Sequence, residues 1–245
     1  MIKKFTRPTR RVTLEVSGIY YREKDMLTLP QELYLLALHE EKGRVPASLS
    51  TSLHYGLGGA ILAELILQGR VGLDDNRKAV VVNNGMFGDD DLLNEGLERI
   101  QASKRHHGAT YWVSTFSDYT RKLEKRLANR LVDQGVLRKE EKRFLGVVPY
   151  EAYPAQDASA RYWIKQHLRS VVLGGEAPDA HTATLLSLVR VCDLLGRVFT
   201  SDEQKMARRK IEALTRGEAI GEAVQQAIET IEAATIAAIM AATSS

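Results

Sequence analysis

Few side chains in this 245-residue sequence have the spacing of a catalytic or metal-binding site. Cys192 falls within an apolar stripe, where a buried, unreactive thiol is expected. His106 and His107 are adjacent in a polar turn, without carboxylate or cysteine partners at metal-ligand spacing. Asp89 to Asp91 lack the spaced donors of a calcium loop and precede a predicted helix, whose N-terminus they would cap. We therefore expect no catalytic residue, no metal site and no cofactor.

The glycines at 56–59 form the sequence GLGG, which two kinds of structure can contain. One is a phosphate-binding loop, but this run lies inside an apolar helical pattern and not between a strand and a helix. Close packing against another backbone fits that context better, because glycine has no side chain. The sequence also lacks G-x-S-x-G, a Walker loop, H-E-x-x-H and C-x-x-C. These observations favour a protein that is not an enzyme.

Basic side chains give the strongest chemical signal in the sequence. The spacing predicts a long helix over 117–135, with leucines on one face and basic residues on the other. A second basic row recurs at i, i+4 and i+8 after the next hairpin. An ordinary solvated helix face is the alternative interpretation. We predict that the two rows bind lipid headgroups or other anions through Arg121, Lys122, Lys125, Arg126, Arg161, Lys165 and Arg169.

The charge is unevenly distributed along the chain, although the net charge is only +3. Residues 1–12 contribute +5 and residues 121–143 contribute another +5, so the remainder is net −7. Such clustering favours a polyanionic partner, either an anionic membrane surface or a nucleic acid. The charge pattern alone does not choose between them.

An apolar hairpin is predicted near residues 143–154, beside basic residues. In one interpretation, one side of the hairpin packs on the core. In the other, an exposed apolar tip with a cationic rim enters a lipid–water interface. The residues that would contact a membrane or a second copy are Phe144, Leu145, Val147, Val148 and Tyr150.

The predicted fold is mainly α, a single compact multi-helix domain over 26–245 that follows a basic arm over 1–25 with one short candidate strand. A hydrophobic content of 44% allows a substantial core. The first helix has capping-box residues Thr28 and Gln31 and would end at Gly43. Further helices are predicted up to Gly69 and after Asp91, and a short hairpin lies between them. The last four are predicted over 157–173, 179–198, 201–214 and 218–241.

The sequence predicts that any membrane association is peripheral. No apolar run approaches the roughly 20 residues that cross a bilayer, and the charged N-terminus lacks the apolar core of a signal peptide. A single cysteine is compatible with a reducing compartment. We expect a cytoplasmic protein that contacts membranes at their surface.

Several segments resemble the Golgi phosphoprotein 3 family in order and spacing, from about Leu27 to the C-terminal helix. They are LTLPQELYLLALHEEKGRV, GLGGAILAELILQGRV, RLANRLVDQGVL, FLGVVPYEAYP and PDAHTATLLSLVRVCDLLGRVF. The resemblance implies a mainly helical domain with an apolar hairpin for self-association and membrane attachment. It also implies a peripheral protein that binds phosphatidylinositol 4-phosphate and holds glycosyltransferase tails.

The pocket that the resemblance implies is only partly matched. Arg121 matches one pocket arginine, but Glu124 stands where the family has a second one. Gly58 replaces a third arginine and Leu49 the tryptophan. A carboxylate in place of a cation removes a charge-assisted bond to phosphate and adds repulsion. The short N-terminus is similar to bacterial members, and a Golgi location would require a eukaryotic source.

The leading hypothesis is a non-enzymatic peripheral membrane adaptor for anionic lipids, among them a phosphoinositide. A basic helix followed by a hairpin also describes a winged-helix nucleic-acid binder, although the resemblance favours lipid over nucleic acid. A third hypothesis is a scaffold that has lost lipid binding and holds a protein cargo or forms a homo-oligomer.

Overall fold

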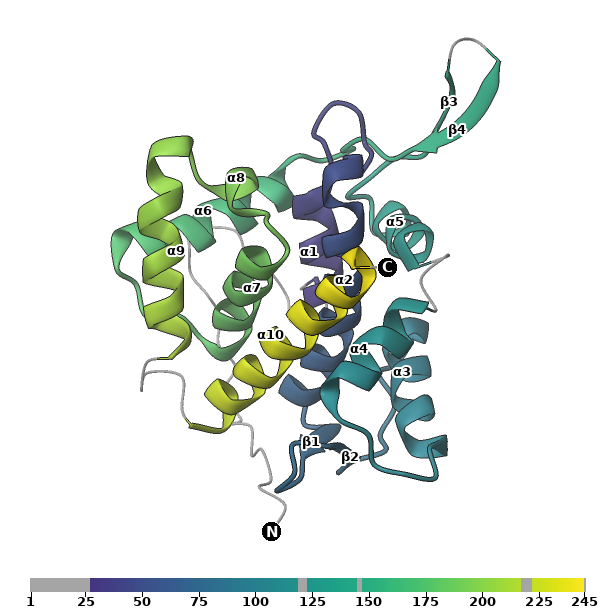
Figure 1. Ribbon diagram of the computed structural model, residues 1–245. Coiled ribbons are helices and arrows are strands. Elements are labelled where there is room, and N and C mark those ends of the chain that lie inside the picture. Colours follow the sequence, from purple (N-terminus) through teal and green to yellow (C-terminus); the bar gives the residue numbers. More distant parts are fainter. Residues whose placement is uncertain (1–26, 119–122, 145–146, 217–221, 245) are drawn as a thin grey trace.

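Helices dominate the computed structural model, which describes residues 27–118, 123–144, 147–216 and 222–244 (Figure 1). The helices are α1 (Leu29–Ala37), α2 (Ala47–Leu67), α3 (Asp91–Ala102), α4 (Ala109–Asp118), α5 (Leu123–Asp133), α6 (Ser159–Gly174), α7 (Ala180–Val191), α8 (Leu195–Val198), α9 (Ser201–Thr215) and α10 (Glu222–Thr243). Two antiparallel hairpins join β1 (Val71–Leu73) to β2 (Ala79–Val81) and β3 (Glu140–Phe144) to β4 (Val148–Ala152). The predicted mainly α fold is confirmed. The basic arm predicted over 1–25 lies outside the described residues.

Helix α2 runs through the middle of the molecule (Figure 1), and every residue from Gly56 to Ile66 is buried, because this part of the helix is almost entirely apolar. Helices α1, α3, α4, α7 and α10 pack around it. Their buried side chains, from Leu29 in α1 to Ala238 in α10, form one continuous core. The compact multi-helix arrangement is built on this shared core.

The GLGG run lies in the middle of α2, and each of its three glycines allows a close contact with another part of the chain. A Cβ atom at Gly56 would lie 2.1 Å from Cys192 Sγ, and one at Gly58 would lie 2.4 Å from the Val113 carbonyl oxygen of α4. The interpretation as helix packing is therefore confirmed. Cys192 is fully buried, and burial raises the pKa of its thiol to about 12.

Polar side chains cap the helices where the sequence predicts. Thr28 and Gln31 form the expected capping box of α1. Asp90 Oδ1 accepts a hydrogen bond from the Leu93 amide at 3.1 Å and so caps α3. The predicted end of the first helix at Gly43 is wrong, because Leu38 adopts an extended conformation and a separate turn follows it.

The prediction of one long helix over 117–135 is also wrong at the N-terminal end of that range. Ser117 and Asp118 belong to α4, a helix that the sequence did not predict, and α5 begins at Leu123. The helix predicted over 179–198 is divided into α7 and α8, because Asp193 adopts a left-handed conformation with a φ of 59°. Helices α6, α9 and α10 lie where they were predicted, within a few residues.

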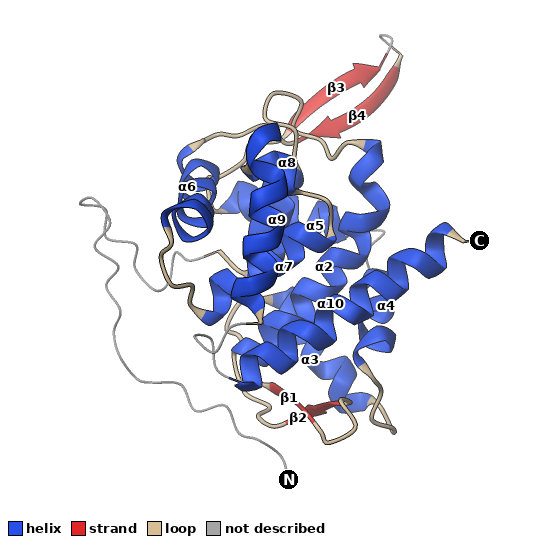
Figure 2. Cartoon of the chain, turned by 60° about the vertical axis from the view of Figure 1, so that its left-hand side comes forward, coloured by secondary structure: helices blue, strands red, loops and turns tan. Residues whose placement is uncertain are grey.

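The two hairpins lie at opposite ends of the molecule (Figures 1 and 2). Hairpin β1–β2 lies against the helical body, whereas β3–β4 extends away from it. Within the described ranges, no helix has both the length and the hydropathy that crossing a bilayer requires.

Candidate functional site

The hairpin β3–β4 projects from the helical body (Figure 2), and two valines near its turn are exposed. Its register runs from Glu140 opposite Ala152 to Phe144 opposite Val148. Near the turn, Val147 is 75% exposed and Val148 is 57% exposed. Two exposed valines on a protruding hairpin do not contribute to the core, so they are available for a contact outside this chain.

One backbone hydrogen bond ties the base of the hairpin to the body, and a second joins the two arms of the hairpin at the base. The Tyr153 amide donates to the Gly43 carbonyl at 2.8 Å, and the Arg138 amide donates to the Pro154 carbonyl at 3.0 Å. The first bond joins the chain after β4 to the loop between α1 and α2. The base is therefore fixed on the core, while the end with the two valines extends into solvent.

Cations border the hairpin, and two of them have no carboxylate partner among the described residues. Arg143 is exposed in β3, near the turn. Arg44 lies with its guanidinium carbon 4.5 Å from the centre of the Tyr150 ring, which is cation–π distance. Arg138 and Lys142, by contrast, both bind Glu140, at 2.8 Å and 3.0 Å.

Lys125, from the predicted basic helix, binds a carboxylate of the hairpin. Its Nζ lies 3.0 Å from Glu151, which also accepts hydrogen bonds from Lys139 Nζ at 2.8 Å and the Tyr153 hydroxyl at 2.6 Å. Hydrogen bonds from Lys139, Tyr153 and Lys125 together lower the pKa of Glu151 to about 2. This network holds α5 against the hairpin base.

A cleft of about 660 Å³, here called the hairpin cleft, opens beside this network. Its walls come from α1, the α1–α2 loop, α2, α5 and the end of β4. The lining side chains that carry charge or hydroxyl groups are Tyr34, Arg44, Ser50, Glu124, Lys125, Glu151 and Tyr153. Glu124 has no hydrogen-bond or ion-pair partner among the described residues, and burial raises its pKa.

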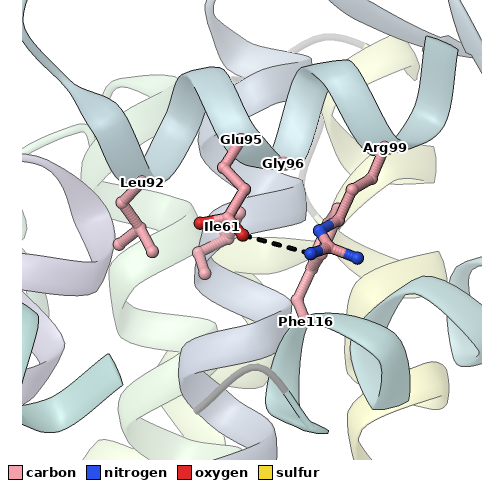
Figure 3. Close-up of a pocket in the computed structure, with 6 residues that line it drawn as sticks. All are labelled: Ile61, Leu92, Glu95, Gly96, Arg99 and Phe116. Carbon is pink, nitrogen blue, oxygen red and sulfur yellow. Dashed lines mark hydrogen bonds and ion pairs between the residues drawn. The ribbon is translucent and has the colours of Figure 1, made fainter. Parts of the chain in front are cut away.

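Carboxylates of α3 neutralise the other basic residues of α5. Arg126 binds Asp91 and Glu95, each at 2.6 Å, and Arg130 binds Asp90 at 3.2 Å. Figure 3 shows Glu95 turned toward Arg99, 3.1 Å away, across a recess of about 10 Å³, which holds at most one water. The aspartates predicted as helix caps thus also form ion pairs. The expected open basic face of this helix is not found at Arg126 or Arg130.

The second basic row also faces the protein's own carboxylates. Lys165 Nζ lies 2.5 Å from Glu40, and Arg169 makes a bidentate contact with Glu203 at 2.7 and 2.8 Å. Arg161 is only 7% exposed, and burial lowers its pKa. These three side chains do not extend the surface around Lys125 as one open patch. A role for them in lipid binding stays a prediction.

Unpaired cations gather instead at a place that the sequence reasoning missed. Arg77, Lys78, Lys104 and Arg105 are exposed and form no ion pair within the described part of the chain. The Ala79 amide donates to the His107 carbonyl at 2.9 Å, which brings the two loops together. This group, here called the basic end, lies beside β1–β2, at the opposite end from β3–β4 (Figure 1). In the sequence, this group is signalled only by two pairs of adjacent basic residues, Arg77–Lys78 and Lys104–Arg105.

Several predicted site residues lie outside the described part of the chain. They are Arg121, Lys122 and Leu145, together with the side chain of Phe144. Of the family pocket positions, Leu49 is buried and Gly58 packs against α4, so neither offers a polar group to a ligand. Within the described residues, no three histidine, cysteine, aspartate or glutamate side chains are arranged to hold a metal ion.

The structure is therefore that of a mainly α protein whose exposed features are one protruding apolar hairpin and a polar cleft at the base of that hairpin. The chain belongs to the Golgi phosphoprotein 3 (GPP34) family, whose model matches residues 29–231. The resemblance seen in the sequence is thereby confirmed.

Two fungal relatives are similar to this chain. Vacuolar protein sorting-associated protein 74 of Schizosaccharomyces pombe is 33% identical over 172 residues, which are 62% of this chain and 50% of the relative. The protein of the same name from Eremothecium gossypii is 30% identical over 166 residues, 60% of this chain and 49% of the relative. The matched part of the chain thus spans about half the length of these relatives.

Proposed function

We propose that this protein is a non-enzymatic peripheral membrane adaptor, which contacts anionic lipid surfaces with hairpin β3–β4 and the cations beside it. The exposure of Val147 and Val148 at the protruding end carries the proposal. Burying a valine side chain contributes about 1.5–3 kcal/mol. A cation near an anionic leaflet adds about 1 kcal/mol, and Arg143 and Arg44 have no carboxylate partner there within the described ranges.

Family membership supports the same function. The family takes its name from a Golgi phosphoprotein, and the fungal relatives are named for vacuolar protein sorting. Both names refer to membrane compartments. Membrane lipids are therefore the partner that we propose, and a protein cargo would be held by the rest of the adaptor.

We assign the main membrane contact to the hairpin, because basic residues of α5 and α6 are already paired with carboxylates of the protein. Arg126 and Arg169 are held by carboxylates, so an anionic membrane or a nucleic acid would have to displace those partners first. The same pairing argues against the winged-helix hypothesis, because Arg126 and Arg130 of its basic face bind carboxylates of the protein. A phosphoinositide remains part of the proposal only through Arg121 and Lys122, in the segment that precedes α5.

Flotation with vesicles tests the proposal. Vesicles with a large fraction of phosphatidylglycerol should capture the wild-type chain, and capture should fall as salt is raised. V147D/V148D should lower capture at least about tenfold. The substitution removes the apolar side chains that would enter the membrane and adds two negative charges, which an anionic surface repels.

The basic end provides a matched control with a distinct outcome. K104E/R105E reverses two exposed cations of the basic end, at the opposite end of the molecule from β3–β4, so capture should stay near the wild-type level. If K104E/R105E abolishes capture and V147D/V148D does not, the hairpin is not the contact surface and the proposal is wrong.

A further inference from the structure

Two charged groups of opposite sign on the wall of the hairpin cleft have no ion-pair partner among the described residues. Glu124 projects from α5, and Arg44 comes from the loop between α1 and α2. Neither has an ion-pair partner in the described ranges, and the Arg44 guanidinium packs on Tyr150. The other two charged residues that line the cleft, Lys125 and Glu151, pair with each other, so these two stand out.

The other titratable groups that line the cleft do not change this balance. Lys125 and Glu151 bind each other at 3.0 Å, and Glu151 is also held by Lys139. Burial lowers the pKa of His54, which favours the uncharged imidazole. Tyr34 and Tyr153 keep their protons, because burial raises the pKa of both hydroxyls. Among the groups that line the cleft, Arg44 and Glu124 therefore remain as charges without a counter-charge, and Lys139, outside the lining, adds one positive charge beside Glu151.

The unpaired carboxylate favours a cationic ligand group over an anionic one. A partly buried charge without a partner has lost part of its hydration, and the raised pKa of Glu124 reflects that loss. An ammonium group bound there would supply both a counter-charge and hydrogen-bond donors. A phosphomonoester would instead bring up to two negative charges against this carboxylate.

We propose that the hairpin cleft binds the phosphoethanolamine headgroup of a membrane lipid, with its primary ammonium on the Glu124 carboxylate and its phosphodiester on the Arg44 guanidinium. The volume of about 660 Å³ lies in the usual range of small-ligand sites. The lipid source rests on the proposed function, because the hairpin would bring the cleft to the bilayer surface. The headgroup chemistry itself rests on the two unpaired charges.

Titration calorimetry with soluble glycerophosphoethanolamine tests the headgroup assignment on the full chain. E124Q should weaken binding about tenfold or more, because a charge-assisted hydrogen bond is lost while the side-chain shape is kept. R44Q should weaken binding as well. D133N, which changes an exposed carboxylate of the same helix, should bind as the wild type does.

Three results would overturn the headgroup assignment. They are no binding by the wild type, equal binding by E124Q, and equal binding of glycerophosphocholine or glycerol 3-phosphate, which lack the primary ammonium. Vesicles test the source: phosphatidylethanolamine added to the vesicles in place of phosphatidylcholine should raise capture of the wild type but not of E124Q. If it raises neither while the soluble headgroup binds, the lipid source is wrong.

The two proposals can fail separately. V147D/V148D should still bind the soluble headgroup, because the valines lie at the far end of the hairpin from the cleft. E124Q should still be captured by phosphatidylglycerol vesicles that contain no phosphatidylethanolamine. If the wild type binds the soluble headgroup but not the vesicles, the proposed function is wrong. If it binds phosphatidylglycerol vesicles but not the soluble headgroup, the headgroup assignment is wrong.

Discussion

Replacing Arg190 with alanine should lower the free energy of unfolding by about 2–4 kcal/mol. Arg190 Nη2 of α7 lies 2.6 Å from Glu232 Oε1 of α10, and the two side chains are only 18% and 14% exposed. Ser187 Oγ donates to the same carboxylate oxygen at 2.5 Å. Removing the guanidinium would leave a nearly buried carboxylate with a single hydroxyl donor. This pair helps to hold the C-terminal helix on the body.

Urea denaturation followed by circular dichroism measures the effect, and two variants serve as controls. R208A breaks a 3.9 Å contact with Asp193 between exposed side chains, so it should cost less than about 1 kcal/mol. R190M/E232M removes both charges and should recover most of the loss. A loss below about 1 kcal/mol for R190A would show that the α7–α10 pair does not stabilise the fold.

Stability should fall as the pH rises from about 6.5 to about 9, by roughly 2–3 kcal/mol. Burial alone would lower the pKa of His181, but Glu32 lies 2.6 Å from its Nε2 and raises that pKa to about 9. The folded chain therefore keeps a proton that the unfolded chain releases near pH 6.5. The stabilisation is complete below pH 6.5 and is lost as the pH rises through 9.

Thermal melts at several pH values between 6.5 and 9 test this linkage. H181Q should be less stable at pH 6.5 and should lose most of the slope over this range. H106Q changes an exposed imidazole and should keep the wild-type slope. A wild-type melting temperature that does not change between pH 6.5 and pH 9 would contradict the ion pair between α1 and α7.

Local signals in the sequence were sufficient for much of the fold. The capping box of Thr28 and Gln31 and the apolar periodicity of α2 depend on neighbouring residues, so one segment is enough to recognise them. Helix α4 was missed because its sequence, ATYWVSTFSD, is rich in aromatic and β-branched residues. Packing against α2 and α10 stabilises that helix instead.

The candidate site was harder to predict, because it depends on pairing between distant segments. Arg126 is separated from Asp91 by 35 positions, and Arg169 from Glu203 by 34. Periodicity places such cations on one face of a helix, but it does not tell which carboxylates another helix brings to them. The hairpin was predicted correctly because its strands and its apolar residues are contiguous in the sequence.

The measurement that tests the central claim most directly is the membrane depth of residue 147. A spin label on V147C can be placed without removing Cys192, because that thiol is fully buried. On phosphatidylglycerol vesicles, the label should become protected from a water-soluble nickel chelate and more accessible to oxygen. A label on N76C, in the β1–β2 turn, should stay in water. If the label at 147 remains in water while the protein is bound, the hairpin does not enter the membrane and the account is wrong.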